Sequence, residues 1–134
     1  MKEDIIHPEV KDIAVAIVKE LNEEGEEVWT SYLINMKGVK LEGVLVSSKG
    51  YGEINGEKRE TSVLRHFLDE VPERSISKIE PIIQEVFGMF NEYWVSFYIE
   101  KMMYDKKYIF VPESISVDNF TEIPFLGKRG VMIV

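Results

Sequence analysis

The chain has 134 residues, 45% of them hydrophobic and 30% charged, a composition that supports one folded domain with its own core. Its net charge of -8 has the wrong sign for a surface that neutralises phosphates, so we expect no nucleic-acid partner. The absence of cysteine excludes disulfides, thiolate metal sites and cysteine nucleophiles. No apolar run approaches the roughly 20 residues that span a bilayer, so we expect no membrane association and a cytoplasmic location.

Turn-forming residues recur along the whole chain at the short spacing that is typical of all-β domains. Residues 11–21 form the first periodic segment and fit two patterns. Ile13, Val15 and Ile17 alternate as in a strand, while the wider set of apolar residues fits an amphipathic helix. We favour the strand, because β-branched residues dominate the segment and residues 22–27 resemble a hairpin loop.

The following segments predict further strands. Residues 28–36 are rich in strand formers and carry bulky side chains on both faces. Residues 39–48 predict a central strand, because they contain a short apolar run suited to burial on both sides. Residues 49–58 predict a long exposed loop or a small hairpin, in which Asn55-Gly56 accepts the positive φ angles of a type I′ turn.

Residues 61–68 are the second ambiguous segment. Their apolar residues suit either a short helix or a strand, and we again favour the strand. Residues 75–82 predict a strand that Pro81 confines to a sheet edge or a strand end, because proline cannot donate a ladder hydrogen bond.

The clearest alternation of the chain covers residues 92–103. We expect residues 104–107 to turn the chain into a further strand at 108–111, so that the two form a hairpin. With this hairpin the chain has seven candidate strands. That number and spacing predict an all-β, seven-stranded antiparallel sandwich of the immunoglobulin or fibronectin III type.

Two features of this architecture stay open at the level of sequence. The alternative fold is α+β, with helices at 9–21 and 61–69. Either Trp29 or Trp94 fills the central core position that a tryptophan occupies in such sandwiches.

Five short strings are distributed over most of the chain. They are Tyr32-Leu33-Ile34-Asn35, Val44-Leu45-Val46-Ser47-Ser48-Lys49-Gly50-Tyr51-Gly52, Thr61-Ser62-Val63-Leu64-Arg65-His66-Phe67, Glu92-Tyr93-Trp94-Val95-Ser96-Phe97-Tyr98 and Tyr104-Asp105-Lys106-Lys107. Over about residues 12–115 the chain resembles a family of small uncharacterised bacterial single-domain proteins. That family has no established activity, so the resemblance implies a stand-alone bacterial domain and carries over no catalytic residue.

Candidate catalytic and metal-binding groups are few. Ser62 and Asp69 flank His66 at a spacing that a helix would gather loosely and a strand would scatter, so we interpret His66 as a structural histidine partnered by a carboxylate or carbonyl. The acidic loop at 23–27 lacks the spacing of a calcium loop and predicts a solvated charge cluster. We therefore predict no metal and no cofactor, and we favour a non-enzymatic function over an enzymatic one.

Arg65 alternates with Val63 and Phe67, which predicts an inward arginine that needs a carboxylate partner such as Glu80 or Glu100. The chain also has more aromatic residues than one sheet face can bury, which predicts a partner surface.

The last residues of the chain are entirely apolar: Val131, Met132, Ile133 and Val134. We predict a β-sandwich domain at 1–116 and a C-terminal segment at 117–134 that either docks on its own domain or exchanges with a second subunit. The four terminal residues are candidate interface residues.

The function predicted from sequence is a non-enzymatic interaction module that binds a protein partner or itself, as in a homodimer. The alternative is a small-ligand-binding protein or minor enzyme with a pocket formed by Tyr51, Arg65, His66 and Trp94, four residues with polar or aromatic groups set among apolar strands.

Overall fold

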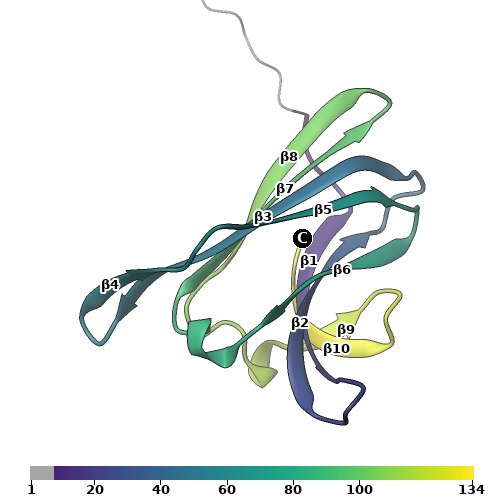
Figure 1. The fold of residues 1–134 in the computed structure, drawn as a ribbon. Helices are drawn as coiled ribbons and strands as arrows, with labels where there is room; N and C mark the ends of the chain where they lie inside the picture. The colour runs from purple at the N-terminus through teal and green to yellow at the C-terminus, as the bar shows by residue number, and fades with distance from the viewer. Residues whose placement is uncertain (1–7) are drawn as a thin grey trace, which may run out of the picture.

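The computed structural model describes residues 8–134, which form ten β-strands and two short 3-10 helices (Figure 1). The strands are β1 (Ile13–Leu21), β2 (Glu27–Asn35), β3 (Leu41–Ile54), β4 (Glu57–Glu60), β5 (Leu64–Val71), β6 (Ser75–Ile82), β7 (Phe90–Ile99), β8 (Met102–Phe110), β9 (Thr121–Ile123) and β10 (Lys128–Ile133). The 3-10 helices are η1 (Gln84–Val86) and η2 (Val117–Asn119).

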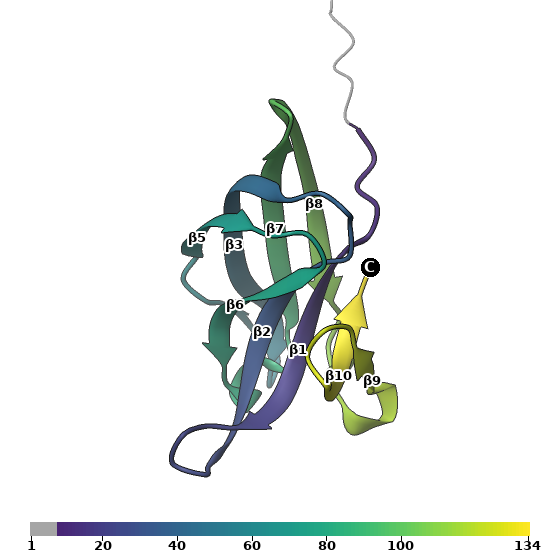
Figure 2. The same ribbon diagram turned by 90° about the vertical axis from the view of Figure 1, so that its right-hand side faces the viewer.

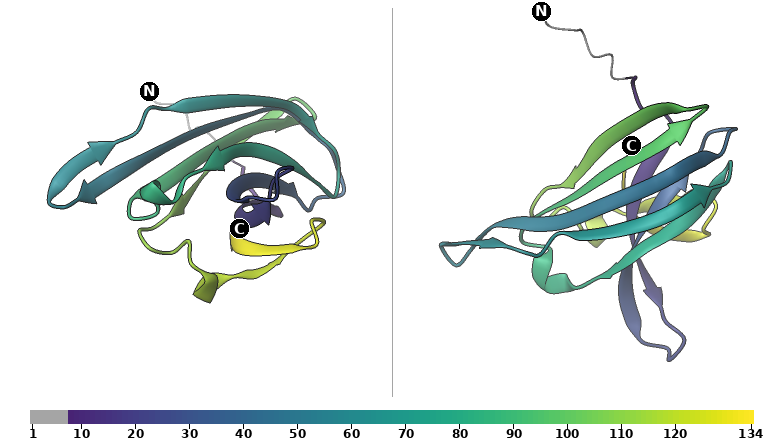
Figure 3. Two further views of the ribbon diagram at one scale, coloured as in Figure 1. Left: turned by 60° about the horizontal axis from the view of Figure 1, so that its bottom comes forward. Right: turned by 45° about the horizontal axis from the view of Figure 1, so that its top comes forward.

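The strands form two antiparallel sheets that pack as two layers (Figure 2). Sheet A has the order β6-β2-β1-β10-β9. Sheet B has the order β4-β3-β7-β8, and β5 also pairs with β3. The chain passes from sheet B to sheet A between β5 and β6, at one corner of the sandwich, and the β3–β4 hairpin projects beyond both layers (Figure 3).

The main core lies between the inner faces of the two sheets. Because side chains alternate along a strand, every second residue of the central strands points into this layer. Val15 and Leu33 of sheet A pack in one cluster with Val46 and Val95 of sheet B, and all four are fully buried.

The tryptophan of the core is Trp29. Its ring lies edge-on to Phe87 and Phe120, with ring centroids 5.0 and 6.0 Å apart, and this aromatic group closes one end of the sandwich. Trp94 lies on the outside of sheet B and is 45% exposed.

The outer face of sheet A is covered by the chain itself. Ala14 and Ala16 lie at its centre, and the residues that pack around them include Tyr32 of β2, Ile123 of β9 and Leu126 of the β9–β10 turn. The two alanines are short enough for the C-terminal segment to pack closely over them. Both faces of β1 are therefore buried.

The C-terminal segment docks on its own domain. β10 pairs with β1, so that Val131 lies opposite Ile17 and is buried in the main core, while Met132 lies opposite Ala16 on the outer face. Two outcomes were predicted for residues 117–134, docking on their own domain or exchange with a second subunit. In the structure of the single chain they dock on their own domain, and β10 lies between β1 and β9 in sheet A.

The prediction of an all-β fold with two antiparallel sheets is confirmed, but the seven-stranded immunoglobulin or fibronectin III type is not, because the structure has ten strands. The α+β alternative is wrong, since residues 9–21 and 61–69 contribute strands β1 and β5. The apolar residues of β1 resemble a helical pattern because both of its faces are buried. Among residues 8–134 no helix has the length and apolar character needed to cross a membrane.

One hairpin turn was predicted at the wrong place. Residues 104–107 lie inside β8, and the chain turns at Glu100 and Lys101 instead, with φ angles of 49° and 69°. A two-residue hairpin needs positive φ at both turn positions, and glycine, asparagine or aspartate normally supplies it. Glu100 and Lys101 are none of these residue types, so the sequence does not mark this turn.

Two local predictions are confirmed. Asn55 and Gly56 have φ angles of 53° and 80°, as a type I′ turn requires, and they join β3 to β4 in a small hairpin. Pro81 lies on β6, which is an edge strand of sheet A.

Candidate functional site

Three of the four predicted pocket residues lie on the outer face of sheet B. Arg65 lies opposite Ser47, and Ser47 lies opposite Trp94 on the other side of β3. Tyr51 lies four residues beyond Ser47 and so on the same face. His66 follows Arg65 directly, so the alternation of the strand points it to the inner face. Within residues 8–134 the four side chains are therefore divided between two faces of one sheet and line no common cavity.

The prediction that Arg65 points inward toward a carboxylate is wrong. Arg65 is exposed, and the carboxylate of Glu80 contacts His66 instead. Val63 and Phe67, with which Arg65 alternates, are 46% and 67% exposed. The apolar alternation of β5 therefore marks an exposed apolar face.

A hollow of about 430 Å³, which we call the outer groove, lies over the middle of this face. Ser47 and Ser96 line it with short side chains from adjacent strands, and longer side chains that include Arg65, Trp94 and Met103 surround it. A small side chain at the centre of a sheet face leaves room for a group from another molecule.

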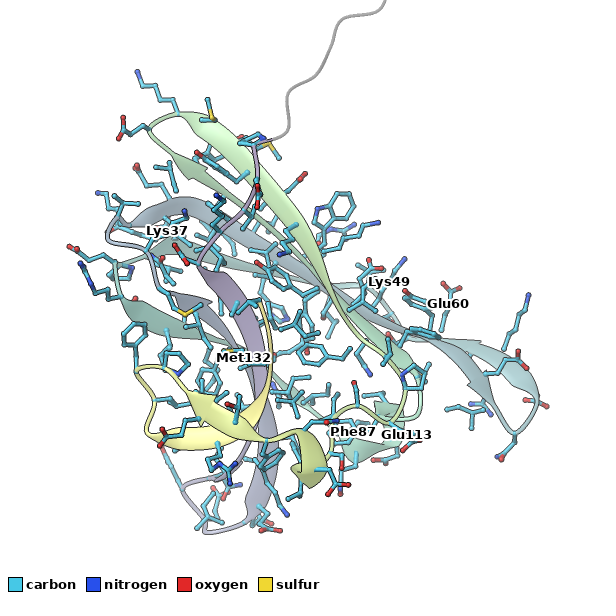
Figure 4. The ribbon with its side chains drawn as sticks, turned by 180° about the vertical axis from the view of Figure 1, so that it is seen from behind. Lys37, Lys49, Glu60, Phe87, Glu113 and Met132 are labelled. Carbon is cyan, nitrogen blue, oxygen red and sulfur yellow. The ribbon has the colours of Figure 1, made fainter. Side chains whose placement is uncertain are left out.

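Cationic side chains lie against the aromatic rings of this face. The Nζ atom of Lys107 is 4.9 Å from the centroid of the Trp94 ring, and that of Lys49 is 5.6 Å from the Tyr51 ring. Burial and then the neighbouring charge of Glu92 raise the pKa of Tyr51. A second hollow of about 540 Å³ shares Lys49 and Glu92 with the outer groove and extends to the base of the β3–β4 hairpin, where Figure 4 labels Lys49.

We call the outer face of sheet B the open face, because seven of its large apolar side chains remain 37% to 67% exposed. They are Leu45, Val63, Phe67, Trp94, Tyr98, Met103 and Ile109. Single exposed apolar residues are ordinary on protein surfaces, but seven large ones on one sheet face favour an interaction surface.

On the inner side of sheet B, His66 belongs to a buried polar cluster around Glu80. Oε1 of Glu80 lies 2.7 Å from Nε2 of His66 and accepts a hydrogen bond of 2.8 Å from the hydroxyl of Ser48. Oε2 accepts a hydrogen bond of 3.1 Å from the hydroxyl of Tyr93. Burial and the charge of Glu80 raise the pKa of Tyr93. The prediction of a histidine partnered by a carboxylate is confirmed.

The arrangement of this cluster differs from that of a catalytic triad. In a triad the imidazole lies between the hydroxyl and the carboxylate, so that it can take the hydroxyl proton. Here the carboxylate of Glu80 lies between Ser48 and His66 and contacts both. The cluster joins β6 of sheet A to β3, β5 and β7 of sheet B, which indicates that Glu80 helps to hold the two sheets together.

A β-bulge aims Glu80 into the protein. The pairing of β2 with β6 shifts register between Ser31 and Tyr32, and this shift leaves Ile79 without a partner. Both Ile79 and Glu80 are consequently buried, although neighbours on a regular strand point to opposite faces. The sequence signal for the bulge was Pro81, since proline in a sheet favours edges and bulges. Sequence reasoning missed Ser48 and Tyr93, which lie on ordinary strands.

The predicted interface residues at the C-terminus contribute to the fold of the single chain. Val131 is 7% exposed, Met132 and Ile133 are partly buried, and Val134 is 64% exposed beyond the end of β10. Three of the four predicted interface residues therefore lie in β10 and pack within their own chain.

Residues 8–134 contain no group of three or more histidine, aspartate or glutamate side chains arranged to hold a metal ion. Comparisons with family models, curated proteins and solved structures find no match to the chain. The interpretation of both sites therefore depends on their geometry and chemistry.

Proposed function

We propose that the chain is a non-enzymatic protein-interaction module that self-associates, with two copies packing through their open faces. The observation that carries this proposal is that seven large apolar side chains remain exposed on one face, the outer face of sheet B, among the charged residues that line the outer groove. Burial of apolar area is the main driving force for association. Sheets pack face to face readily through such side chains.

The composition of the open face supports an interface. Interfaces are enriched in aromatic residues, methionine and arginine, and the largest contributions to binding come from tryptophan, tyrosine and arginine. The open face carries Trp94, Tyr98, Met103 and Arg65 within one short stretch of sheet.

The charges of the face favour a second copy as its occupant. Lys49 and Arg65 line the outer groove together with Glu92 and Asp105, so both signs are present around it. A two-fold interface places the same patch on both subunits, and a patch with mixed charges can oppose its own copy with unlike charges. A strongly acidic or basic face would repel its own copy.

The test is the molar mass in solution, measured by light scattering across a range of protein concentrations. We expect a dimer that dissociates on dilution, and we expect Phe67→Glu or Trp94→Glu to make it monomeric. Leu21→Glu is the matched control, because Leu21 is 65% exposed, like Phe67 at 67%, but lies at the end of the β1–β2 hairpin. A wild-type monomer at all concentrations, or equal effects of Phe67→Glu and Leu21→Glu, would contradict the proposal.

A second candidate function is favoured by the outer groove itself. Its volume of about 430 Å³ lies within the range of small-molecule pockets, Lys107 lies over the Trp94 ring, and Arg65 also lines the groove. These groups suit a flat aromatic carboxylate, which would stack on the indole and pair with the cations. Titration with benzoate tests this candidate, because binding should shift the indole N–H resonance of Trp94 and not that of Trp29.

A further inference from the structure

A separate cavity opens on the inner side of sheet B, at the corner that holds Glu80. We call this hollow of about 340 Å³ the Glu80 pocket. The polar side chains of Ser48, Glu80 and Tyr93 line one part of it, and Ile82 and Val86 are among the apolar residues that line another. A few convergent polar groups in an apolar cavity are typical of small-molecule sites.

The carboxylate of Glu80 has unused hydrogen-bonding capacity. A carboxylate offers about four acceptor positions, and Ser48, His66 and Tyr93 use three of them, two on Oε1 and one on Oε2. Within residues 8–134, neither lysine nor arginine forms an ion pair with Glu80. A buried carboxylate that has free acceptor capacity and contacts only hydroxyl groups and one imidazole favours a cationic donor.

The rest of the cavity lining combines Lys49, Thr61, Ser62 and Asn91 with an apolar wall that is suited to a hydrocarbon group. Leu64 and Ile83 are large apolar lining residues that are 51% and 60% exposed, so they mark the mouth of the pocket. Ile82, which is half-buried, continues the apolar wall inward from Ile83. A ligand that fits both parts has one positive group and a hydrocarbon portion.

We propose that the Glu80 pocket binds a small organic amine. Its ammonium group donates a hydrogen bond to Oε2 of Glu80, and its hydrocarbon portion packs between Ile82 and Val86. This site lies behind sheet B, whereas the proposed dimer uses the opposite face, so each can fail while the other stands.

The test is a titration with hexylamine, with hexanol and hexanoate as neutral and anionic probes of the same length, followed by amide resonances. We expect hexylamine to shift the resonances around Thr61 and Ile83, hexanol to bind more weakly and hexanoate not to bind. Glu80→Gln should weaken hexylamine binding by at least about tenfold, because a charge-assisted hydrogen bond is lost. Glu92→Gln, on the open face, is the matched control and should leave the affinity unchanged.

Two outcomes overturn this proposal. Hexylamine affinity that is equal in Glu80→Gln and the wild type excludes the carboxylate as its site. Shifts confined to the acidic loop at 23–27 indicate general attraction of a cation to an acidic protein. If Glu80→Gln does not fold, Ile83→Trp narrows the mouth from an exposed position and should abolish binding, while Leu21→Trp should not. Unchanged binding to Ile83→Trp also overturns the proposal.

Discussion

The outer faces of the two sheets both have short side chains at their centres, but only the face of sheet A is covered by other residues of the chain. On sheet A, Ala14 and Ala16 are fully buried, because Ile123 and the adjacent β9–β10 turn pack over them. On sheet B, Ser47 and Ser96 occupy the corresponding central positions and line an open groove. Short side chains at the centre of a sheet face leave room for a covering layer in both cases.

This difference indicates what the open face lacks. The chain supplies its own cover for sheet A from its last 18 residues or so, which include β9 and β10. For sheet B, the large apolar side chains around the centre remain exposed, including Phe67 and Trp94. A cover of comparable apolar character from a second copy would make the two faces equivalent in burial.

Removal of the cover should have the largest effect. A truncation after Ser116 deletes β9 and β10, so β1 loses its hydrogen-bonding partner along Val15 to Val18 and Ala16 becomes exposed. We expect loss of the cooperative thermal transition, measured by circular dichroism. The control is deletion of Val134 alone, which is 64% exposed beyond β10 and should leave the transition unchanged. A truncated chain that still unfolds cooperatively would show that residues 117–134 are not needed for the fold of the domain.

The next largest effect is expected where the cover approaches β1 most closely. A Cβ atom at Gly130 would overlap the carbonyl oxygen of Ile17 and lie 3.0 Å from Cα of Val18. Because these are backbone atoms, Gly130→Ala must displace β10, and we expect it to lower the free energy of unfolding by about 3 kcal/mol. Gly38→Ala is the control, since its new methyl group would meet only the flexible Arg74 side chain, at 3.4 Å. Equal urea midpoints for the two variants would contradict a tight β1–β10 contact.

Much of the fold follows from local signals in the sequence. The alternation in residues 28–36 and 92–99, the Asn55-Gly56 turn and the edge position of Pro81 all depend on neighbouring residues and were predicted. The turn at Glu100 was not, because its positive φ angle arises without a turn-forming residue.

The sites depend on features that local patterns do not contain. Phe67 on the open face and Val46 in the core have the same apolar character and the same alternation, so the sequence does not distinguish an exposed face from a buried one. The position of Glu80 depends on a bulge, which changes the face of every residue beyond it. His66 was predicted to have a carboxylate or carbonyl partner. The partner is Glu80, and the sequence does not identify it because the two residues lie on strands of different sheets.

A matched pair of substitutions compares the two face centres directly. Ala16→Val adds two methyl groups beneath the cover of sheet A and should cost about 2 kcal/mol through overpacking. Ser96→Val makes a similar change on the open face and should alter stability by less than about 0.5 kcal/mol. Both are measured by urea unfolding in the Phe67→Glu background, so that dimerisation does not contribute. Equal costs would show that the open face is as tightly packed as the covered one.

The smallest effect concerns a polar contact that joins β10 to β1 and β2 within sheet A. Glu20 accepts hydrogen bonds from the Tyr32 hydroxyl, at 2.8 and 2.9 Å, and from Nζ of Lys128 on β10, at 2.8 Å. Burial alone would raise the pKa of Glu20, but hydrogen bonds from Lys128, Thr30 and Tyr32, with the charge of Lys128, hold this pKa below its ordinary value of 4.5. The contribution of Glu20 to stability is therefore complete above pH 4.5 and is lost as the pH falls through the lower, folded-state pKa.

We expect Glu20→Gln to lower the free energy of unfolding by about 1 kcal/mol at pH 7, because a charge-assisted hydrogen bond becomes a neutral one. The difference from the wild type should shrink as the pH falls below 4.5, where the wild-type carboxylate is also protonated. Glu27→Gln is the control, since the pair of Glu27 with Lys19 spans 3.4 Å at an exposed position and should contribute little at either pH. A Glu20→Gln deficit that is the same at pH 7 and pH 3 would mean that the shape of the side chain, and not its charge, holds β10 beside β1.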